Sequence, residues 1–418
     1  MVSQLWGFWV GAMLLIGASG VLILSVVLFA ECLAALFSKI PLPSLLQDWS
    51  HTRVTVLVPA HNEEICIYPT LVQLGANLKP QDQLVVVADN CTDATVDIAR
   101  SLGATVIERH DLTQIGKGYA LDFGLHYVAD DPPDVVVFVD ADSQVQANTI
   151  QKLTQCAIVT GRPIQATYLM SKPLCSTPKD SVSAFAFKVK NLVRPSGLAQ
   201  LGLPCLLTGT GMAFPWSVIR SVNLASGDLV EDMKLSLDLA VTGHPPLLCQ
   251  DAIVIGQLPQ HKQAAESQRT RWEHGHLQTI LTHVPRMIGV ALQKQQWKPL
   301  VLALDLCIPP LSLFVVIWAG LTIASLFASI LGASWGAMTV LTIAGLFLLS
   351  AMLLAWAKFG RADLLLAELL TIPFYILWKI PLYLKFLVKP QSKWVKTERD
   401  AISLPKPPSV REVASIDD

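Results

Sequence analysis

The sequence has few charged residues and no paired cysteines. Charged residues make up 15% of the 418 positions, whereas 52% are hydrophobic. The eight cysteines are scattered singly, without a Cys-x-x-Cys pair or a regular spacing, so neither a zinc site nor a disulfide framework is indicated. A net charge of −1, with no basic run interleaved with aromatic residues, argues against nucleic-acid binding. The apolar content exceeds that of an ordinary soluble domain, so we expect membrane segments.

The first long uncharged run lies near the N-terminus. Residues 5–30 contain no charged residue, and the apolar stretch continues past Glu31 to Phe37. About 20 apolar residues suffice to cross a bilayer. Because no Lys or Arg precedes this run, and because it is much longer than the apolar part of a signal peptide, we interpret it as an uncleaved transmembrane anchor.

Three further apolar stretches lie in the last third of the chain. Residues 300–331 and 335–356 are separated by a short uncharged turn around Gly332 and predict a transmembrane hairpin. Residues 364–388 contain two prolines and two lysines, namely Pro373, Lys379, Pro381 and Lys385. These interruptions favour an interfacial or re-entrant segment over a clean fourth crossing.

Basic residues indicate how the chain is oriented. They flank the predicted spans at Lys39, Arg53, Lys294, Lys298, Lys358 and Arg361 and continue at Lys389, Lys393, Lys396 and Arg399. All of them fit one cytoplasmic side. We therefore expect a multi-pass protein of the cell membrane, inner or plasma, with its central region and C-terminal tail in the cytoplasm.

The central region, from about Arg53 to Gln257, alternates short β-rich runs with helical stretches. This pattern predicts an α/β domain with a largely parallel sheet. The predicted strands are residues 54–59, 84–88, 105–107 and 135–139, and the predicted helices are residues 63–78, 93–102 and 117–128. Because the strands are continuously apolar, we expect both faces of the sheet to be buried. Ligands of such sheets bind at the carboxyl ends of the strands.

Two common nucleotide-binding motifs are missing. The turn after the first predicted strand, residues 59–64, contains no glycine and is therefore not a dinucleotide-binding Gly-x-Gly-x-x-Gly turn. Gly116-Lys117-Gly118 lacks both the preceding spacing and the following Ser or Thr of a P-loop. Hydride transfer and ordinary nucleoside triphosphate hydrolysis are both disfavoured.

Two carboxylates, Asp140 and Asp142, directly follow the predicted strand 135–139. An Asp-x-Asp often marks a polar strand end or a helix cap and nothing more. Here, paired hard oxygen ligands at the end of a buried strand suit a divalent cation that carries phosphates. Other polar groups accompany the pair in the sequence, in residues 89–93, Glu231-Asp232 and residues 268–272.

Taken together, these motifs resemble the membrane-bound family 2 glycosyltransferases, the group that contains cellulose, hyaluronan and poly-N-acetylglucosamine synthases and ceramide glucosyltransferases. The resemblance covers roughly residues 53–276. It is carried by residues 54–64, 89–93, 116–118, 140–142, 231–232 and 268–272. It implies a GT-A nucleotide-sugar-binding domain with a mostly parallel sheet, flanked by transmembrane helices, a nucleotide-sugar donor that is usually a UDP-sugar, and inversion at the anomeric carbon.

Transfer from such a donor needs stabilisation of the diphosphate leaving group. We expect Asp142, supported by Asp140, to hold Mg²⁺ or Mn²⁺, and Arg271 to bind the diphosphate through both guanidinium arms. The resemblance implies that Gln268 positions the leaving group or the acceptor, and that Trp272 is an apolar platform for the acceptor. An interfacial membrane tryptophan is the alternative for Trp272.

An inverting transfer also needs a base for the acceptor hydroxyl. Asp232 is the candidate. The neighbouring Glu231 would raise its pKa through like charge, whereas a helix N-terminus nearby would lower it. Alternatively, both are ordinary first-turn carboxylates of a helix.

The remaining predicted donor contacts are Pro59, Glu63, Asp89 and Lys117, together with Asp140. By resemblance, Glu63 and Asp89 match nucleoside-contacting positions. Lys117 would approach uracil or phosphate, or would be a solvated cation at a helix start.

Several other features have two readings each. Asp93 contacts the nucleoside or caps its helix. Residues 209–211 form a loop that lets the acceptor approach the backbone, or a plain turn. His61, His274 and His276 lack a second pair at ligand spacing, which disfavours zinc. Residues 394–399 fold back on the cleft or bind anionic lipid headgroups.

The identity of the acceptor is open. We expect transfer to a growing polysaccharide, with single-sugar transfer to a membrane lipid as the alternative. Three crossings give little material for a polymer channel unless the protein forms a homo-oligomer or recruits an export partner. A carrier or structural protein with a degenerate nucleotide domain would not need the intact carboxylates.

The chain divides into six predicted segments. They are a transmembrane anchor at 1–40, the cytoplasmic GT-A domain at 50–260, the Gln268 motif with interfacial helices at 261–298, the hairpin at 299–357, an interfacial, re-entrant or fourth transmembrane segment at 358–390, and a cytoplasmic tail at 391–418.

Overall fold

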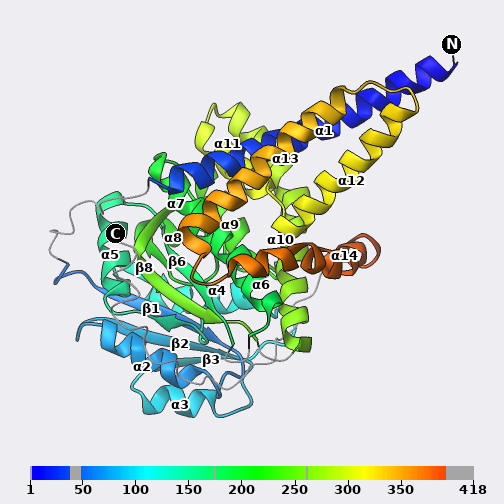
Figure 1. The fold of residues 1–418 in the computed structure, drawn as a ribbon. Coiled ribbons are helices and arrows are strands. Elements are labelled where there is room, and N and C mark those ends of the chain that lie inside the picture. The colour runs from blue at the N-terminus through cyan, green and yellow to red at the C-terminus, as the bar shows by residue number, and fades with distance from the viewer. Residues whose placement is uncertain (1, 38–48, 174–175, 260–261, 392–418) are drawn as a thin grey trace.

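A computed structural model describes residues 2–37, 49–173, 176–259 and 262–391 (Figure 1). In these residues, eight strands form one sheet with the order β3-β2-β1-β4-β7-β6-β8-β5. The strands are β1 (Val54–Ala60), β2 (Gln83–Asp89), β3 (Thr105–Arg109), β4 (Val135–Phe138), β5 (Gln144–Val145), β6 (Ile164–Ser171), β7 (Met212–Pro215) and β8 (Leu247–Gln257). The four predicted strands correspond to β1 to β4, so their existence is confirmed.

The first four strands are parallel, and β1 lies between β2 and β4 with Val56 opposite Leu84 on one side and Val137 on the other. The chain therefore adds β2 and β3 on one side of β1 and then adds β4 on the other side. Ligands of open α/β sheets bind at such a switch point, here between β1 and β4. Beyond β4, the sheet is mixed. Strand β7 is antiparallel to β4 and to β6, and β5 is antiparallel to β8.

Helices cover both faces of the sheet. They are α2 (Ile67–Asn77), α3 (Thr95–Ser101), α4 (Lys117–Val128), α5 (Thr149–Thr160), α6 (Pro178–Lys188), the π-helical turn η1 (Val189–Val193), α7 (Arg194–Gln200), α8 (Trp216–Ile219) and α9 (Glu231–Val241). Alternate residues of β1 point to opposite cores. Val56 packs with α2 and α5, whereas Leu57 packs with α4 and α9. Strands buried on both faces explain the continuous apolar runs.

Helix α2 begins four residues later than the predicted helix 63–78. It starts at Ile67, which places Pro69 in the first turn. Proline is tolerated there because the first amide groups of a helix have no partner within the helix. A start at Glu63 would have placed Pro69 in the interior, where it disrupts the helix. Helix α4 has the predicted bounds.

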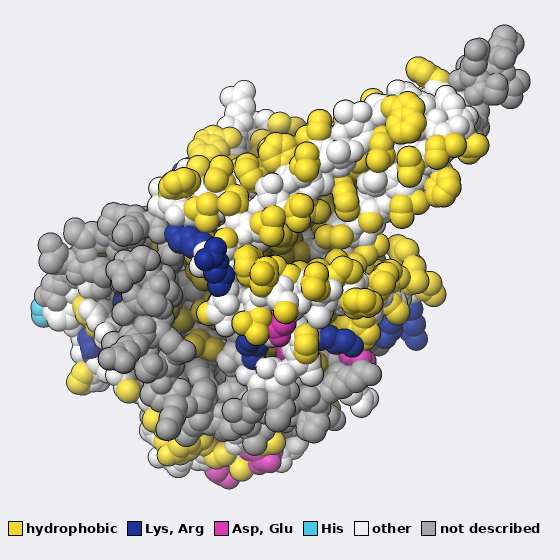
Figure 2. All heavy atoms as spheres, in the orientation of Figure 1, with side chains coloured by type: hydrophobic (Ala, Val, Ile, Leu, Met, Phe, Trp, Pro, Cys, Tyr) yellow, Lys and Arg dark blue, Asp and Glu magenta, His cyan; other side chains and the backbone are white. Residues whose placement is uncertain are grey.

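The remaining helices project from the sheet domain or lie at its edge. They are α1 (Val2–Ala35), α10 (Lys262–Gln293), α11 (Trp297–Cys307), α12 (Leu311–Ile330), α13 (Gly336–Ala355), η2 (Trp356–Gly360), η3 (Leu366–Thr371) and α14 (Ile372–Val388). Figure 1 shows α1, α12 and α13 projecting together, with α14 across their base. In Figure 2, hydrophobic side chains line these projecting helices.

Four helices in the described residues are long and apolar enough to cross a membrane: Gly7–Ala35, Leu311–Ile330, Gly336–Gly360 and Leu366–Val388. The predicted span at residues 300–331 is instead two helices, α11 and α12. They are separated at Pro309-Pro310, because a proline lacks an amide hydrogen and disfavours helix in the residue before it.

Composition alone allows α14 to cross a membrane, so the interfacial, re-entrant and spanning alternatives for this segment all stay predictions. Helix α14 crosses the base of the projecting helices rather than following them (Figure 1). Its Lys379 is buried and forms an ion pair with Glu273 of α10. A span would have to carry this lysine into the bilayer, which is costly.

A buried ionic triad joins the first helix to the rest of the protein. Arg194 of α7 donates from Nε to Glu31 of α1 at 2.9 Å and also contacts Asp305 of α11. All three side chains are at most 7% exposed. Helices α1 and α7 approach closely at Gly197, where an added Cβ would lie 1.9 Å from the carbonyl oxygen of Glu31.

Candidate active site

The sheet and three helices bring eight of the predicted site residues to one cavity of about 570 Å³. These residues are Lys117, Asp140, Asp142, Glu231, Asp232, Gln268, Arg271 and Trp272. The aspartates follow β4, Lys117 begins α4, and Glu231 and Asp232 begin α9. The last three residues lie on α10. Motifs far apart in the sequence therefore form one site.

Lys117 is the centre of the polar cluster. Its ammonium contacts Asp140, lies 3.7 Å from Oε1 of Glu231 and donates a 2.7 Å hydrogen bond to the carbonyl of Gly209. Burial disfavours its charge, but Asp140 and Glu231 outweigh burial and raise the pKa of Lys117. It is therefore a positioned cation, and the alternative of a solvated lysine does not hold.

The loop at residues 209–211 is part of the site. Gly209 and Gly211 have φ angles of 93° and 64°, which favour glycine. An added Cβ at Gly209 would lie 3.5 Å from Oδ2 of Asp232. Between the glycines, Thr210 Oγ1 accepts the Asp140 amide hydrogen at 3.1 Å and shares another 3.1 Å hydrogen bond with Ser143. Thr210 thereby fixes the backbone of the paired aspartates.

Burial dominates the electrostatics of the α9 carboxylates. It raises the pKa of Glu231 to about 7, although Lys117 opposes the shift. It also raises the pKa of Asp232, while Lys190, Lys117 and the amide of Met233 lower it. The sequence predicts a raised pKa of Asp232 from the neighbouring charge of Glu231, whereas the largest cause in the structure is burial. The opposing effect of the helix N-terminus is present, through the Met233 amide.

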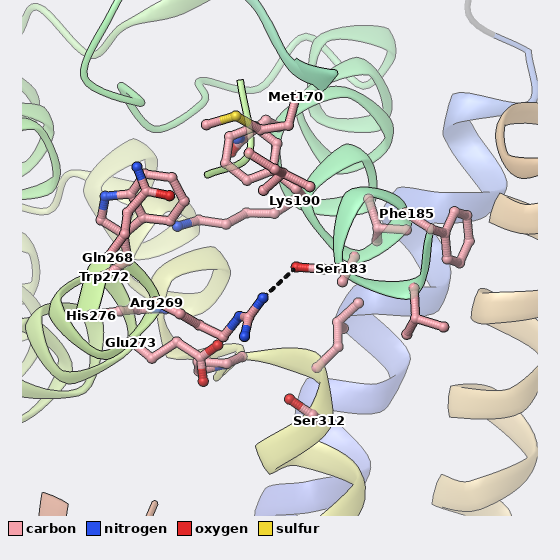
Figure 3. Close-up of a pocket in the computed structure, with 18 of the residues that line it drawn as sticks. Met170, Ser183, Phe185, Lys190, Gln268, Arg269, Trp272, Glu273, His276 and Ser312 are labelled. Carbon is pink, nitrogen blue, oxygen red and sulfur yellow. Dashed lines mark hydrogen bonds between the residues drawn. The ribbon is translucent and has the colours of Figure 1, made fainter. Parts of the chain in front are cut away.

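Gln268, Arg271 and Trp272 occupy one face of α10, because residues three and four apart are neighbours on a helix. The Trp272 ring lies 5.8 Å from that of Phe187, which in turn lies 5.1 Å from that of Tyr168. These three aromatic residues line the cavity. Figure 3 shows Gln268 and Trp272 side by side at one end of it. Trp272 is thus a wall of the cavity, which favours the platform over the interfacial alternative.

Three predicted donor contacts do not line this cavity. Pro59 is paired with Val87 inside the sheet, at the carboxyl-terminal part of β1. The Glu63 carboxylate accepts a hydrogen bond from the Cys66 thiol at 3.0 Å. Burial raises the pKa of Asp89, partly offset by Arg109, whose Nη1 donates to it at 2.7 Å. These residues lie at the ends of β1 and β2, beside the site.

Asp93 accepts the amide hydrogen of Thr95, the first residue of α3, at 3.0 Å, which supports the helix-capping alternative. The three histidines are hydrogen-bonded to backbone carbonyls: His61 to Asp89, His274 to Leu382 and His276 to Leu306. Burial lowers the pKa of His276 to about 3, so this ring is neutral at pH 7.

Across the described residues, no group of three or more His, Cys, Asp and Glu could hold a metal. The protein thus supplies the two carboxylates Asp140 and Asp142, both partly exposed to the cavity. Two carboxylates completed by substrate phosphates and water are a common arrangement for Mg²⁺. The donor set therefore fits a divalent ion that arrives with a diphosphate.

Away from these polar groups the cavity becomes apolar. Its lining there comes from α6, α12, α13, η2, η3 and α14: Val182, Phe185, Leu311, Val315, Leu349, Met352, Leu353, Trp356, Leu369, Ile372 and Ile376. Residues 394–399, proposed to fold back on the cleft, lie outside the described part of the chain.

Sequence reasoning singled out the loop 209–211 but gave Thr210 no role of its own, and it missed Lys190. Thr210 stands between two glycines, a weak signal of a constrained turn. Lys190 lies within a helical stretch in which no motif marks it.

Comparisons with known proteins agree with this geometry. A family model described as glycosyltransferase like family 2 matches residues 51–275. The probable glycosyltransferase YdaM of Bacillus subtilis is 28% identical over 262 residues, which are 55% of this chain and 56% of that protein. A 4,4'-diaponeurosporenoate glycosyltransferase of Staphylococcus aureus is 32% identical over 128 residues, 30% of this chain and 33% of that protein. The matches thus span about half or less of these relatives.

One solved structure resembles most of the chain. It is the mannosyltransferase PcManGT from Pyrobaculum calidifontis in complex with GDP-Man and Mn²⁺. The TM-score is 0.53 at 18% identity, and the match covers 87% of this chain and 99% of that one. At this identity, the likeness shows the fold.

Proposed function

Because the chain belongs to glycosyltransferase-like family 2 and has the GT-A fold, we propose that it transfers a sugar, with inversion and with the help of a divalent metal, from a UDP-sugar to a membrane lipid. The observation that carries this proposal is the single cavity in which Asp140, Asp142, Asp232 and Arg271 meet. Membership of the family supports glycosyltransferase activity. That activity, the donor, the metal, the stereochemistry and the acceptor are what we propose.

Asp140 and Asp142 would hold Mg²⁺ or Mn²⁺, which stabilises the charge that develops on the diphosphate. Arg271, on the facing helix α10, would bind the same diphosphate. Lys117 fixes Asp140 and the Gly209 carbonyl in position. The aspartates, the lysine and the arginine together surround the place for the leaving group.

Asp232 would act as the base. The oxygen of an acceptor hydroxyl attacks the anomeric carbon while the bond from this carbon to the diphosphate oxygen breaks. The hydroxyl proton passes to Asp232, and the nucleoside diphosphate leaves with the bonding electrons. A buried carboxylate with a raised pKa is a stronger base than an exposed one.

The shape of the cavity favours the lipid over the polysaccharide that the sequence analysis preferred. From Asp232 the lining continues into apolar side chains of α12, α13 and α14, among them Val315, Leu353 and Ile376. A glycan would need hydrogen-bonding partners along its path, whereas an acyl or polyprenyl chain would not. The staphylococcal relative is named for a lipid-type acceptor, which also supports this choice.

Location and assembly are proposed with the same function. Helices α1, α12 and α13 would span the cell membrane, the sheet domain would lie in the cytoplasm, and α14 would lie at the interface. Single-sugar transfer to a lipid does not require a homo-oligomer or an export partner.

The test uses the full-length protein in lipid nanodiscs. Release of nucleoside diphosphate is measured across a panel of UDP- and GDP-sugars, with Mg²⁺ or Mn²⁺ and with EDTA, and the lipid product is analysed by mass. We expect metal-dependent release from one UDP-sugar and a mass increase of one sugar. A ladder of sugars would contradict the lipid acceptor, and no release from any donor would contradict the enzyme.

Two variants test the assigned carboxylates. We expect Asp142→Asn and Asp232→Asn each to lose at least about 100-fold in transfer, because one removes a metal ligand and the other the base. Asp238→Asn is the matched control, since Asp238 lies on the same helix α9 with its side chain 50% exposed. Wild-type transfer by either site variant would refute the role assigned to that residue.

A further inference from the structure

Lys190 is a cation in the cavity with no assigned role. It lies on η1, the π-helical turn between α6 and α7, and it lines the cavity. Figure 3 shows its side chain extending toward Gln268 and Trp272, whereas Phe185 on the preceding helix points to the other end. A π-helical turn inserts one residue into a helix and re-aims the side chains around it, and such turns are frequent at functional sites.

Within the described residues, no hydrogen bond or ion pair joins Lys190 to another group. Three other cations that line this cavity do have a carboxylate partner. Lys117 contacts Asp140, Arg194 contacts Glu31 and Asp305, and Lys379 contacts Glu273. Burial lowers the pKa of Lys190, and the charge of Asp232 is the largest opposing influence. A partly buried cation without an ion pair in a largely apolar cavity is costly, so a bound anion would be favoured there.

The position of Lys190 identifies which substrate would bring the anion. The donor diphosphate is assigned to the side of Lys117, Asp140 and Asp142. Figure 3 shows the Lys190 side chain extending toward Trp272, the residue favoured above as the platform for the acceptor. Lys190 therefore lies on the acceptor side of the base.

We propose that Lys190 binds an anionic group of the acceptor, so that the acceptor is an acidic amphiphile. Its apolar chain would lie among Phe185, Val315, Leu353 and Ile376, its anionic group on Lys190, and its hydroxyl at Asp232. This inference rests on the proposed lipid acceptor and makes it more specific. A phosphate and a carboxylate share the required charge.

The first test needs no variant. Total membrane lipids of the host are separated on an anion-exchange column into neutral and acidic fractions, and each fraction is offered to the wild-type protein in nanodiscs with its donor. We expect the one-sugar mass increase in the acidic fraction. Fragmentation of the product then shows whether the acid is a phosphate or a carboxylate. Products found in the neutral fraction alone would overturn the inference, while leaving the transferase itself established.

The second test removes the charge. We expect Lys190→Met to raise the KM for the acidic acceptor about 10- to 100-fold, as for a lost hydrogen bond to a charged group, while the KM for the donor stays within about twofold. Lys190→Arg should restore most of the affinity. Lys234→Met, at a lysine of α9 that pairs with Asp238, is the control.

The thermal unfolding midpoint separates binding from structure. Because Lys190 forms no hydrogen bond or ion pair among the described residues, we expect Lys190→Met to fold and to unfold near the wild-type temperature. An unchanged KM in a folded Lys190→Met protein would overturn the inference. If wild-type protein releases no nucleoside diphosphate from any donor, the proposed function fails instead, and this inference fails with it.

Discussion

At the scale of single residues, the site depends on charges that are compensated only by one another. Lys117 connects Asp140, Glu231 and the Gly209 carbonyl, and the Glu231 side chain is 18% exposed. Removal of one member leaves the others buried with excess charge of one sign. Side chains that never touch a substrate are therefore needed for the geometry of those that do.

Glu231 gives this cluster a testable pH dependence. Its pKa of about 7 in the folded protein exceeds the ordinary value of 4.5, so the folded state binds this proton more tightly than the unfolded state. The contribution of Glu231 to stability is therefore largest below about pH 4.5 and is lost as pH rises through about 7.

We expect the difference in Tm between Glu231→Gln and wild type to become more positive from about pH 5 to about pH 8, because glutamine does not ionise. Thermal unfolding in nanodiscs measures it. A difference that does not change with pH would mean that Glu231 titrates near its ordinary pKa. Taking the difference cancels the titration of the groups that do not interact with Glu231.

Residue types and their neighbours in the sequence were enough to find the carboxylates, because each follows an apolar strand or belongs to a spaced motif. The role of Thr210 in holding the Asp140 backbone could not be found in this way. The contact between Thr210 and Asp140 depends on the antiparallel pairing of β4 with β7, in which Phe138 faces Met212. Asp140 lies two residues after Phe138 and Thr210 two residues before Met212, so the same pairing brings these two together. Lys190 was missed because no sequence motif marks it, and because its place in the cavity depends on how the π-helical turn packs.

At the scale of helices and strands, close contact between α1 and α7 depends on Gly197. An added Cβ would lie 1.9 Å from the Glu31 carbonyl oxygen, and a backbone atom in a packed helix cannot move aside cheaply. We expect Gly197→Ala to destabilise the protein by about 2 kcal/mol or more. Gly75→Ala in α2 is the control, because nothing lies within 4 Å of the added Cβ.

The measurement is the thermal unfolding midpoint in nanodiscs, together with transfer activity. A normal midpoint for Gly197→Ala would mean that α1 and α7 are further apart than described. Helix boundaries show the same dependence on small local features. Pro69 delays the start of α2, and Pro309-Pro310 divides a stretch whose hydropathy alone predicted one span.

At the scale of the whole molecule, the long apolar helices also line part of the candidate site. Side chains of α12, α13 and α14 continue the lining that begins at Asp140, Asp142 and Asp232. Hydropathy predicted the apolar helices and the α/β domain separately. It could not predict a cavity shared by both, because that depends on how α6, α10 and α14 pack together.

The proposed topology can be tested with introduced cysteines. We expect Ser334→Cys, in the exposed turn between α12 and α13, to react with a membrane-impermeant maleimide in intact cells. Lys152→Cys, in the sheet domain, should react only after permeabilisation. Labelling of Lys152→Cys in intact cells would place the sheet domain outside and overturn the orientation.

The buried triad of Glu31, Arg194 and Asp305 has a consequence for biosynthesis. Arg194 follows Glu31 by 163 residues, and Asp305 follows Arg194 by another 111. The ribosome therefore completes α1 long before the guanidinium that neutralises its carboxylate has been made. Until α7 docks, the nascent chain exposes an acidic group at a helix surface that is buried in the mature protein. Completion of the triad thus reports that the first helix, the sheet domain and α11 have all assembled.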